Sequence, residues 1–285
     1  DTSGPEEYAS ARGKLNTFVA ETGAPYYEAM RSTALGLHLR SRDLPLYWGN
    51  MLALHDVPDN SQGAKGSDVL LRQLGNLLGQ AQTDLLIVSP YFVPGKPGTE
   101  ALVAAVQRGA RVRIVTNSLA STDVGAVHAG YKKSRRKLLE AGVELFELKP
   151  AVDADTQAAG KLSFSGSSAA SLHAKTFMID RERVFIGSMN LDPRSVQINT
   201  EIGILIDNPE LARHLENTIG AGLQQACYSV VLEPRNPAKP QGGRDLVWIE
   251  QRGGQEIRYT TEPQTTFWQR FSVGFIGIFP VDSQL

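Results

Sequence analysis

The hydrophobic and polar positions follow two different patterns along this chain. The N-terminal part is irregular and polar, with amphipathic helical spacing only at residues 10–22 and 26–34. Residues 58–66 are dominated by Gly, Ser, Asn, Asp and Pro, which predicts an exposed loop. Regular spacing begins after this loop. We therefore expect residues 1–66 to form a connector with helices, and a folded lobe to begin at residue 67.

From residue 67 onward, short apolar runs alternate with longer segments of helical spacing. The expected order is helix 68–81, strand 85–88, helix 100–108, strand 112–115, helix 122–141 and strand 143–148. Alternation of strand and helix is typical of an α/β layer fold with parallel strands. The fold class predicted from the pattern is therefore α/β.

The remaining part of the chain predicts mainly strands. A Gly-, Ser- and Ala-rich loop at 152–170 precedes two strand runs, 174–179 and 183–186, which only three residues separate, so we expect a hairpin. A strand at 201–206, a helix at 209–225 and a strand at 227–232 close the lobe, which spans 67–232. Residues 233–285 are rich in Pro and Gly, with a hairpin around Gly253 and Gly254, and form a C-terminal extension that packs on the lobe or faces a membrane.

Composition narrows the classes of function. The 29 Lys and Arg residues nearly balance the 30 Asp and Glu residues, whereas a protein that binds nucleic acid usually has a basic excess. A single cysteine, Cys227, excludes an internal disulfide and a zinc site with several thiolates. The apolar run at 271–280 is much shorter than the roughly 20 residues of a membrane-spanning helix. The chain starts without Met, so we expect that an upstream part was removed or that the chain is a cut fragment.

The residues that suggest chemistry lie around the expected hairpin. His173 and Lys175 are two apart on an extended segment, so they project to the same side. A lysine on a buried strand needs a compensating anion. The tight turn at Gly187 and Ser188 would place Ser188 and Asn190 near the same point. An imidazole nucleophile, an ammonium and two neutral polar groups suit a phosphate ester, because they neutralise its oxygens while histidine attacks in line.

The spacing of these residues resembles the signature of the phospholipase D superfamily: His173-x-Lys175, four residues, Asp180, six residues, then Gly187-Ser188-x-Asn190. The segments 89–94, 116–123, 127–131, 190–195 and 279–285 are similar to those of bacterial cardiolipin synthases, a resemblance that covers about residues 68–285 and, more weakly, the first 60. It implies a phospholipase D-like mixed sheet flanked by helices, one lobe of a usually two-lobed enzyme.

The resemblance also implies roles for the motif residues. His173 would be the nucleophile that forms a phosphohistidine, or the acid that protonates the leaving alcohol. Lys175 and Asn190 would bind the phosphate with help from Ser188. Glu201 stands where the family has a carboxylate that orients the histidine, which would fix its tautomer and stabilise the imidazolium.

The other candidate residues are less specific. Asp180 ends the first strand of the hairpin, and we expect it to hold the turn by ion pairing before any catalytic role. Residues in the family-like segments are expected on the substrate side: Tyr91, Asn117, Ser118, His128 and Arg194. His128 has a structural reading of equal weight, and Tyr91 at a strand end is more often a packing residue.

Two surface features have two readings each. The basic cluster at 132–137 is a solvated helix face or a surface for anionic lipid headgroups. The aromatic segment 267–279 either docks on the lobe or lies in the headgroup region of a membrane, and its two glycines weaken a helix assignment.

The chain departs from the family in carrying one motif where these enzymes have two that face each other. Of its five histidines, only His173 lies in such a motif. The chain is therefore expected to be the C-terminal half of a longer enzyme, with a homodimer that pairs two motifs and a non-catalytic lipid-binding lobe as alternatives.

The expected activity is phosphatidyl transfer of the cardiolipin synthase type, acting on a lipid similar to phosphatidylglycerol, or hydrolysis when water is the acceptor. A nuclease of the same superfamily is the alternative among enzymes. No cofactor or metal is expected, because lysine and asparagine supply the charge stabilisation. The expected partners are a phospholipid and a membrane surface, without nucleic acid, and the expected location is the periphery of a bacterial inner membrane.

Overall fold

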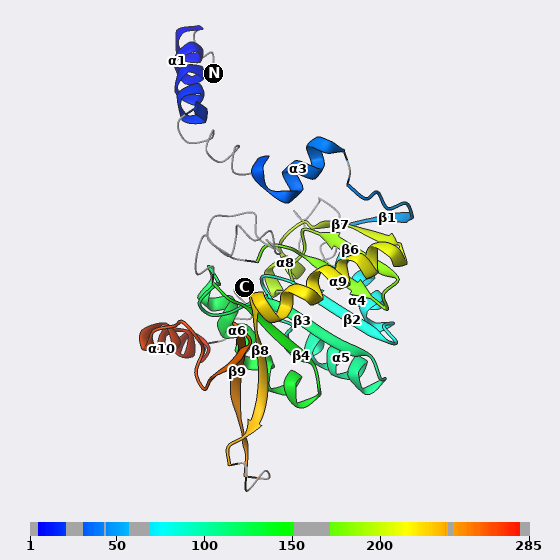
Figure 1. Cartoon of the computed structure of the whole chain (residues 1–285), viewed down its shortest axis with the longest axis vertical. Helices are drawn as coiled ribbons and strands as arrows, with labels where there is room; N and C mark the ends of the chain where they lie inside the picture. Colours follow the sequence, from blue (N-terminus) through cyan, green and yellow to red (C-terminus); the bar gives the residue numbers. More distant parts are fainter. Residues whose placement is uncertain are drawn as a thin grey trace. The chain divides into compact units, whose positions relative to one another are not determined.

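The structure, a computed structural model, describes residues 5–20, 31–42, 44–56, 69–150, 172–236, 238 and 242–279 (Figure 1). Contacts divide the chain into two compact units, Asp1–Leu46 and Tyr47–Leu285. The first unit contains helices α1 (Pro5–Phe18) and α3 (Ala34–Ser41). Thr33 begins α3 by accepting a 3.0 Å hydrogen bond from the Gly36 amide. Most of the helix predicted at 26–34 lies outside the described residues, as do the predicted loops at 58–66 and 152–170.

The described part of the second unit is built on a ten-stranded sheet in the order β1-β7-β6-β5-β2-β3-β4-β8-β9-β10. The strands are β1 (Asn50–His55), β2 (Asp84–Val88), β3 (Arg111–Asn117), β4 (Glu144–Leu148), β5 (Thr176–Ile179), β6 (Arg183–Gly187), β7 (Ile202–Asp207), β8 (Cys227–Pro234), β9 (Arg244–Arg252) and β10 (Gln255–Tyr259). β2, β3 and β4 are parallel, and the other paired strands are antiparallel. The mixed sheet is thus confirmed, and parallel pairing holds for the three strands where strand and helix alternate.

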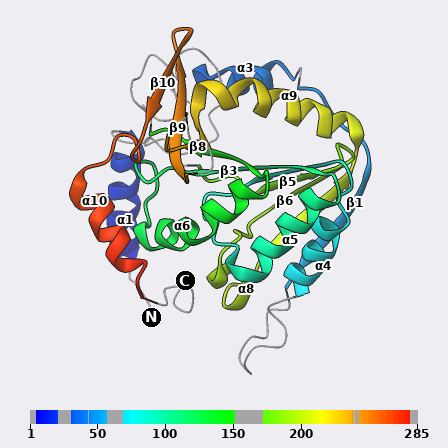
Figure 2. The ribbon, with the colours of Figure 1, turned by 90° about the horizontal axis from the view of Figure 1, so that it is seen from below.

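Helices cover both faces of this sheet. α4 (Val69–Gly79), α5 (Gly95–Gln107) and α6 (Gly125–Glu140) lie on one side, and α9 (Pro209–Ala226) lies on the other (Figure 2). Each side has its own core of buried side chains against the central strands. β2 is buried along its whole length, which explains why it reads as a continuous apolar run. No helix in the described ranges has the length and apolarity needed to cross a membrane.

Both ends of the second unit add strands to the sheet. β1, from the segment that the sequence analysis assigned to the connector, pairs antiparallel with β7. In the C-terminal extension, β9 and β10 form the expected hairpin, and Gly253 and Gly254 both adopt positive φ angles at its turn. The extension ends in α10 (Phe267–Ile276), which forms despite its internal glycine because Thr266 and Gln269 make a capping box.

The strand directions gather several loops at one edge of the sheet. Val88 at the end of β2 pairs with Thr176 at the start of β5, and Thr176 pairs with Ile186 in the predicted hairpin of β5 and β6. Gly187 at the end of β6 pairs with Gly203 near the start of β7. The segments that follow β2, β3 and β6, and those that precede β5 and β7, therefore meet at this edge. In open α/β sheets, the carboxyl ends of the strands are where ligands bind.

Candidate active site

His173 and Lys175 lie in the extended segment that leads into β5. The buried Asn117 side chain at the end of β3 makes two hydrogen bonds to the backbone of Leu172 in this segment. Its Oδ1 accepts from the Leu172 amide at 2.9 Å, and its Nδ2 donates to the Leu172 carbonyl at 3.4 Å. His173 is exposed, and the Lys175 ammonium donates to its carbonyl at 2.9 Å. Asn117, predicted on the substrate side, thus fixes the backbone immediately before His173.

Ser188 and Glu201 form a hydrogen-bonded pair next to this segment. The Gly187 amide donates to the Lys175 carbonyl at 3.1 Å, so the Gly-Ser turn lies directly beside Lys175. The Ser188 hydroxyl donates to the Glu201 carboxylate, which also accepts from Asn199 Nδ2 at 3.1 Å. The structure therefore brings Lys175, Ser188 and Glu201 together.

The Glu201 backbone is held by Asp56, a residue that the sequence analysis did not single out. The Glu201 amide donates to Asp56 Oδ2 at 3.1 Å, and the Asp56 amide donates to the Glu201 carbonyl at 2.9 Å. The other carboxylate oxygen of Asp56 accepts from the Leu70 amide at 3.0 Å. Because Asp56 and Glu201 are buried, these bonds fix the entry into β7. Asp56 follows a strand that the apolar pattern did not reveal, so no sequence signal marked it.

The orientation of His173 by Glu201, which the family resemblance implies, stays a prediction. The hydrogen bonds of the Glu201 carboxylate run to Ser188 and Asn199. Among the described residues, no side chain is hydrogen-bonded to the His173 imidazole. In this arrangement Glu201 positions the Gly-Ser turn, and the imidazole is accessible to a ligand.

Lys175 is a half-buried cation whose pKa is affected by the charges of three carboxylates. Desolvation lowers the pKa of its ammonium, and the negative charges of Glu201, Asp192 and Asp123 act in the opposite direction. Asp192 caps the short helix α8 (Pro193–Gln197) by accepting from the Arg194 and Ser195 amides at 2.9 and 3.1 Å. Burial raises the Asp192 pKa, its hydrogen bonds oppose that rise, and the charge of Glu201 adds to it. These acids and Lys175 form one coupled electrostatic site.

The segment after β2 completes this edge. Phe92 forms a β-bridge with Leu191, and the Val93 amide donates to the Leu191 carbonyl at 2.6 Å. The Tyr91 hydroxyl donates to Asp123, with its two carboxylate oxygens at 2.9 and 2.8 Å. Desolvation and this hydrogen bond raise the Tyr91 pKa to about 12. Tyr91 therefore stays a neutral hydrogen-bond donor. Its acceptor, Asp123, is one of the carboxylates whose negative charge acts to raise the Lys175 pKa.

The structure places three more of the predicted residues near this edge. The Asn190 side-chain oxygen is buried, and no donor among the described residues is hydrogen-bonded to it. Arg194 is exposed on α8. Ser118 is buried, and its hydroxyl donates to the Ser121 hydroxyl at 3.1 Å within the loop after β3.

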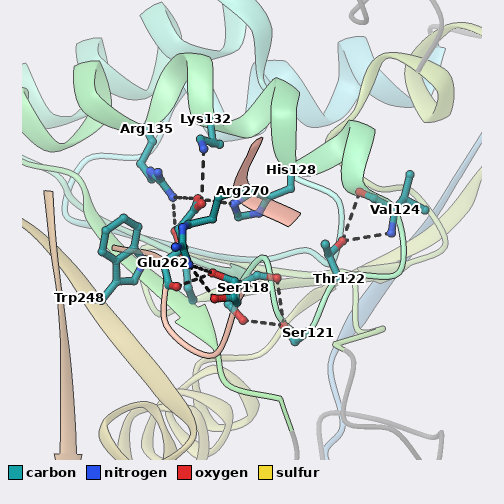
Figure 3. A network of polar contacts seen from close by, with 12 residues as sticks. Ser118, Ser121, Thr122, Val124, His128, Lys132, Arg135, Trp248, Glu262 and Arg270 are labelled. Atoms are coloured by element: carbon teal, nitrogen blue, oxygen red, sulfur yellow. Dashed lines mark hydrogen bonds and ion pairs between the residues drawn. The ribbon is translucent and has the colours of Figure 1, made fainter. Parts of the chain in front are cut away.

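Within the described residues, the His128 side chain is hydrogen-bonded to Glu262 and not to a motif residue. It is buried on α6, and its Nε2 lies 2.9 Å from Glu262 Oε1 (Figure 3). Arg135 donates to the same Glu262 oxygen at 3.2 Å and to Glu147 at 3.0 Å, and Trp248 also donates to Glu147 at 2.8 Å. Glu262, distant in sequence from its partners, was not predicted.

Asp180 lies at the opposite end of β5, roughly 16 Å from Lys175 at about 3.3 Å per residue. Its carboxylate accepts from the backbone amides of Gln82, Thr83 and Asp84 at 2.8–3.1 Å. The predicted ion pairing is not what holds the turn, because within the described ranges the bonds of Asp180 are to amides and a hydroxyl. Burial opposes ionisation, but these hydrogen bonds prevail and lower the Asp180 pKa.

None of the described His, Cys, Asp and Glu side chains form a group of three or more that could hold a metal ion. The site that the described residues do form consists of one exposed imidazole, one ammonium, a Ser–Glu pair and an amide whose buried oxygen has no hydrogen-bond donor among those residues. Such a set can provide a nucleophile, charge neutralisation for phosphate oxygens and hydrogen bonds to an alcohol.

Comparison with known proteins extends this picture. The family described as "Cardiolipin synthase, PLD-like domain" matches residues 74–221, which include all the motif residues. Cardiolipin synthase C of Escherichia coli K12 is 38% identical over 258 residues, covering 90% of this chain and 53% of that protein. An uncharacterised protein of Helicobacter pylori 26695 is 30% identical over 236 residues, covering 83% and 44%. The chain thus spans about half the length of these curated relatives.

Among solved structures, a phospholipase D family member, Nuc from Salmonella typhimurium, superposes with a TM-score of 0.46 at 18% sequence identity. The superposition covers 65% of this chain and 99% of that one.

Proposed function

The chain belongs to the cardiolipin synthase, phospholipase D-like domain family, and we propose that it carries out phosphatidyl transfer between phospholipids with His173 as the nucleophile. The observation that carries this proposal is the convergence of Lys175, the Ser188–Glu201 pair and Asn190 beside His173 at one sheet edge. The chain spans about half of its relatives, so the activity of the whole protein is part of the proposal.

In the first step, an imidazole nitrogen of His173 attacks the phosphorus of a phosphatidyl ester. A nitrogen–phosphorus bond forms, and the bond between phosphorus and the leaving alcohol oxygen breaks. The leaving oxygen takes a proton from a general acid, for which we propose a second motif supplied by an upstream half or by another copy. Lys175 neutralises the non-bridging oxygens, which carry the negative charge in the transition state.

In the second step, the hydroxyl of an acceptor alcohol attacks the phosphohistidine, the nitrogen–phosphorus bond breaks, and the group that had acted as acid takes the hydroxyl proton. An amide such as that of Asn190 suits this step, because its oxygen accepts from an alcohol while its nitrogen donates to a phosphoryl oxygen. Water in place of the alcohol would give hydrolysis. Orientation of the imidazole by Glu201 belongs to this proposal.

Two observations weigh against the nuclease alternative. The formal net charge is −1, and Asp123, Asp192 and Glu201 surround Lys175 with negative charge. A polyanion with many phosphates would be repelled by such a site, whereas a lipid brings a single phosphodiester. The proposed substrate is therefore a phospholipid similar to phosphatidylglycerol, taken from the periphery of a bacterial inner membrane.

The test is lipid mass spectrometry after incubation of the chain with phosphatidylglycerol vesicles. His173→Ala is compared with His214→Ala, which removes an exposed histidine from α9. New cardiolipin or phosphatidic acid that disappears in His173→Ala but persists in His214→Ala supports the proposal. An acid-labile, alkali-stable phosphate adduct on the peptide that contains His173 identifies the intermediate.

If the chain alone forms no product, the same comparison is repeated with the upstream half added. Full turnover of the His173→Ala variant in that completed enzyme would refute His173 as the nucleophile. Binding of phosphatidylglycerol without adduct or product in the completed enzyme would favour a non-catalytic lipid-binding lobe.

A further inference from the structure

Helix α10 exposes a row of large apolar side chains. Phe267, Trp268, Phe271 and Phe275 on the helix, with Ile278 and Phe279 directly after it, are between 52% and 78% exposed and are here called the aromatic ridge. Neighbouring rings of the ridge contact one another, with centroids 5.3–6.1 Å apart. Soluble proteins rarely leave such contiguous apolar surface uncovered without a binding role.

The opposite side of α10 is attached firmly to the lobe. Val273 is buried and packs with Leu119 and Ala129. The segment before the helix is held through Glu262, on which His128, Lys132 and Arg135 of α6 converge (Figure 3). The ridge is therefore presented outward by an anchored helix.

The surface beside the ridge is basic. Lys133 of α6 donates to the Phe279 carbonyl at 3.4 Å. Together with Lys96 and Lys137 it lines a cavity of about 230 Å³ between α5 and α6, and all three lysines are exposed. Residues 267–279 contain Arg270 and no acidic residue. Lysines next to aromatic rings match a surface that is apolar inside and anionic at its boundary, which is the chemistry of an anionic bilayer.

The ridge also lies near the candidate active site. α6 begins two residues after Asp123. The Asp123 carboxylate accepts a hydrogen bond from Tyr91, and its negative charge acts to raise the pKa of Lys175. α10 packs on this first part of α6, where a Cβ at Gly125 would lie 3.5 Å from Val273. A surface held by α10 is thus close to the edge of the sheet where the motif residues converge.

We propose that the aromatic ridge and the three lysines dock the protein on an anionic lipid bilayer. The rings insert at the boundary between headgroups and acyl chains, and Lys96, Lys133 and Lys137 bind lipid phosphates. Docking of this kind brings the sheet edge to the membrane surface from which the proposed transferase takes its lipid. That consequence rests on the proposed function, whereas docking itself is measured without any reaction.

The experiment is flotation of the full chain with vesicles of phosphatidylcholine containing phosphatidylglycerol, or of phosphatidylcholine alone. We expect Trp268→Ala with Phe271→Ala to reduce the fraction bound to anionic vesicles at least tenfold. Trp48→Ala is the matched control, because Trp48 is 83% exposed and lies outside α10, and it should bind normally. Replacing Lys96, Lys133 and Lys137 by Gln should weaken binding to anionic vesicles, whereas Arg213→Gln on α9 should not.

A second measurement tests docking with the aromatic ridge intact. In a Trp48→Phe background, brominated lipids should quench Trp268, since the other tryptophan, Trp248, is buried. Unchanged flotation of the ridge variant, or no quenching, would overturn the proposal. Self-association that the ridge variant abolishes, without any vesicle binding by the unaltered chain, would likewise overturn it and identify the ridge as a contact between copies.

The docking result and the proposed function can fail separately. If the ridge variant loses vesicle binding but keeps its turnover of a short-chain, monomeric phosphatidylglycerol, docking and transfer are both supported. If the unaltered chain docks through the ridge but the completed enzyme turns over neither substrate, the transferase proposal fails and docking stands.

Discussion

We expect the positive charge of Lys175 to bind the phosphate group of the substrate. Replacement by Ala removes the cation that meets the phosphate, so we expect kcat to fall by roughly 10²–10³, about 3–4 kcal/mol, as for the loss of one transition-state donor. Desolvation lowers the Lys175 pKa, so the ammonium loses its proton below the ordinary lysine value of 10.5. The rate should therefore decline on the alkaline side before pH 10.5.

The pH dependence of kcat/KM tests this assignment. Lys175→Arg keeps a positive charge that does not titrate in this range, so the alkaline decline should vanish even if the maximal rate is reduced. A decline that persists unchanged in Lys175→Arg would show that another group causes it.

Glu262 offers a prediction about stability. Hydrogen bonding to His128 and the charges of Arg135 and Lys132 outweigh desolvation and lower its pKa to about 2. A carboxyl group whose pKa is lower in the folded state stabilises the protein above its unfolded pKa and loses this effect as pH falls through the folded pKa. The contribution of about 3 kcal/mol should thus be complete above pH 5 and disappear between pH 4.5 and 2.

We expect Glu262→Gln to lower the free energy of unfolding at pH 7 by about 3 kcal/mol, because it leaves the buried Arg135 guanidinium with less compensation. Urea titrations at several pH values check this, with Glu256→Gln on the exposed part of β10 as control. Equal losses for Glu262→Gln at pH 7 and pH 2 would contradict the assignment.

At the scale of elements, the close approach of β6 and β7 sets the position of the Ser188–Glu201 pair. A Cβ on Gly187 would lie 2.6 Å from the Ile202 carbonyl oxygen, which is backbone and has little room to move. Gly187→Ala should separate the strands, cost about 1–3 kcal/mol of stability and displace Ser188, so activity should fall by more than tenfold.

The matched control is Gly220→Ala on α9, where a Cβ meets nothing within 4 Å and Ala favours the helix. Chemical denaturation and the transfer assay measure both effects. Normal activity of Gly187→Ala in a folded protein would show that the spacing of β6 and β7 does not position the site.

Replacement of Asp180 should lower the stability of the protein without lowering kcat of the folded enzyme. The Asp180 carboxylate ties the turn of the β5–β6 hairpin to the start of β2 through three backbone amides, far along β5 from Lys175. Asp180→Ala leaves these amides without their acceptor and places Ala at a φ of +55°, so we expect a loss of about 2–3 kcal/mol. Asp180→Asn, which tolerates this φ and keeps one acceptor oxygen, should recover part of it. A fall in kcat at temperatures where Asp180→Ala is fully folded would instead indicate a catalytic role.

At this scale, the sequence could predict only elements and contacts whose residues lie close together along the chain. The parallel strands, the hairpin and the convergence of Lys175 with Ser188 follow from patterns within about 30 residues. β1 was missed because its partner β7 is about 150 residues away, and so was Asp56, which acts through the same pairing. The partners of His128 were missed for the same reason, since Glu262 lies 134 residues further along the chain. α10 was doubted because glycine disfavours helices, but its capping box and its packing on α6 outweigh that preference.

At the scale of the whole molecule, the described edge of the sheet presents one imidazole, whereas the proposed chemistry needs a nucleophile and a separate general acid. In the proposed mechanism His173 attacks phosphorus, so it is not free to protonate the leaving alcohol in the same step. Of the other four histidines, His128 is buried against Glu262, and none lies in a second motif. We propose that the complete site draws its general acid from a second polypeptide segment, with an upstream half as its source.

This arrangement predicts how an inactive variant behaves in a mixture. With the upstream half in excess, each chain pairs with its own second motif, so adding His173→Ala should leave the rate per unaltered chain constant. If two copies instead formed one site, each unaltered chain paired with the variant would lack the acid, and the rate per unaltered chain would fall in proportion to its fraction. Transfer assays across a series of mixtures at constant total protein distinguish a flat line from a proportional decline, and the decline would replace the upstream half with a homodimer.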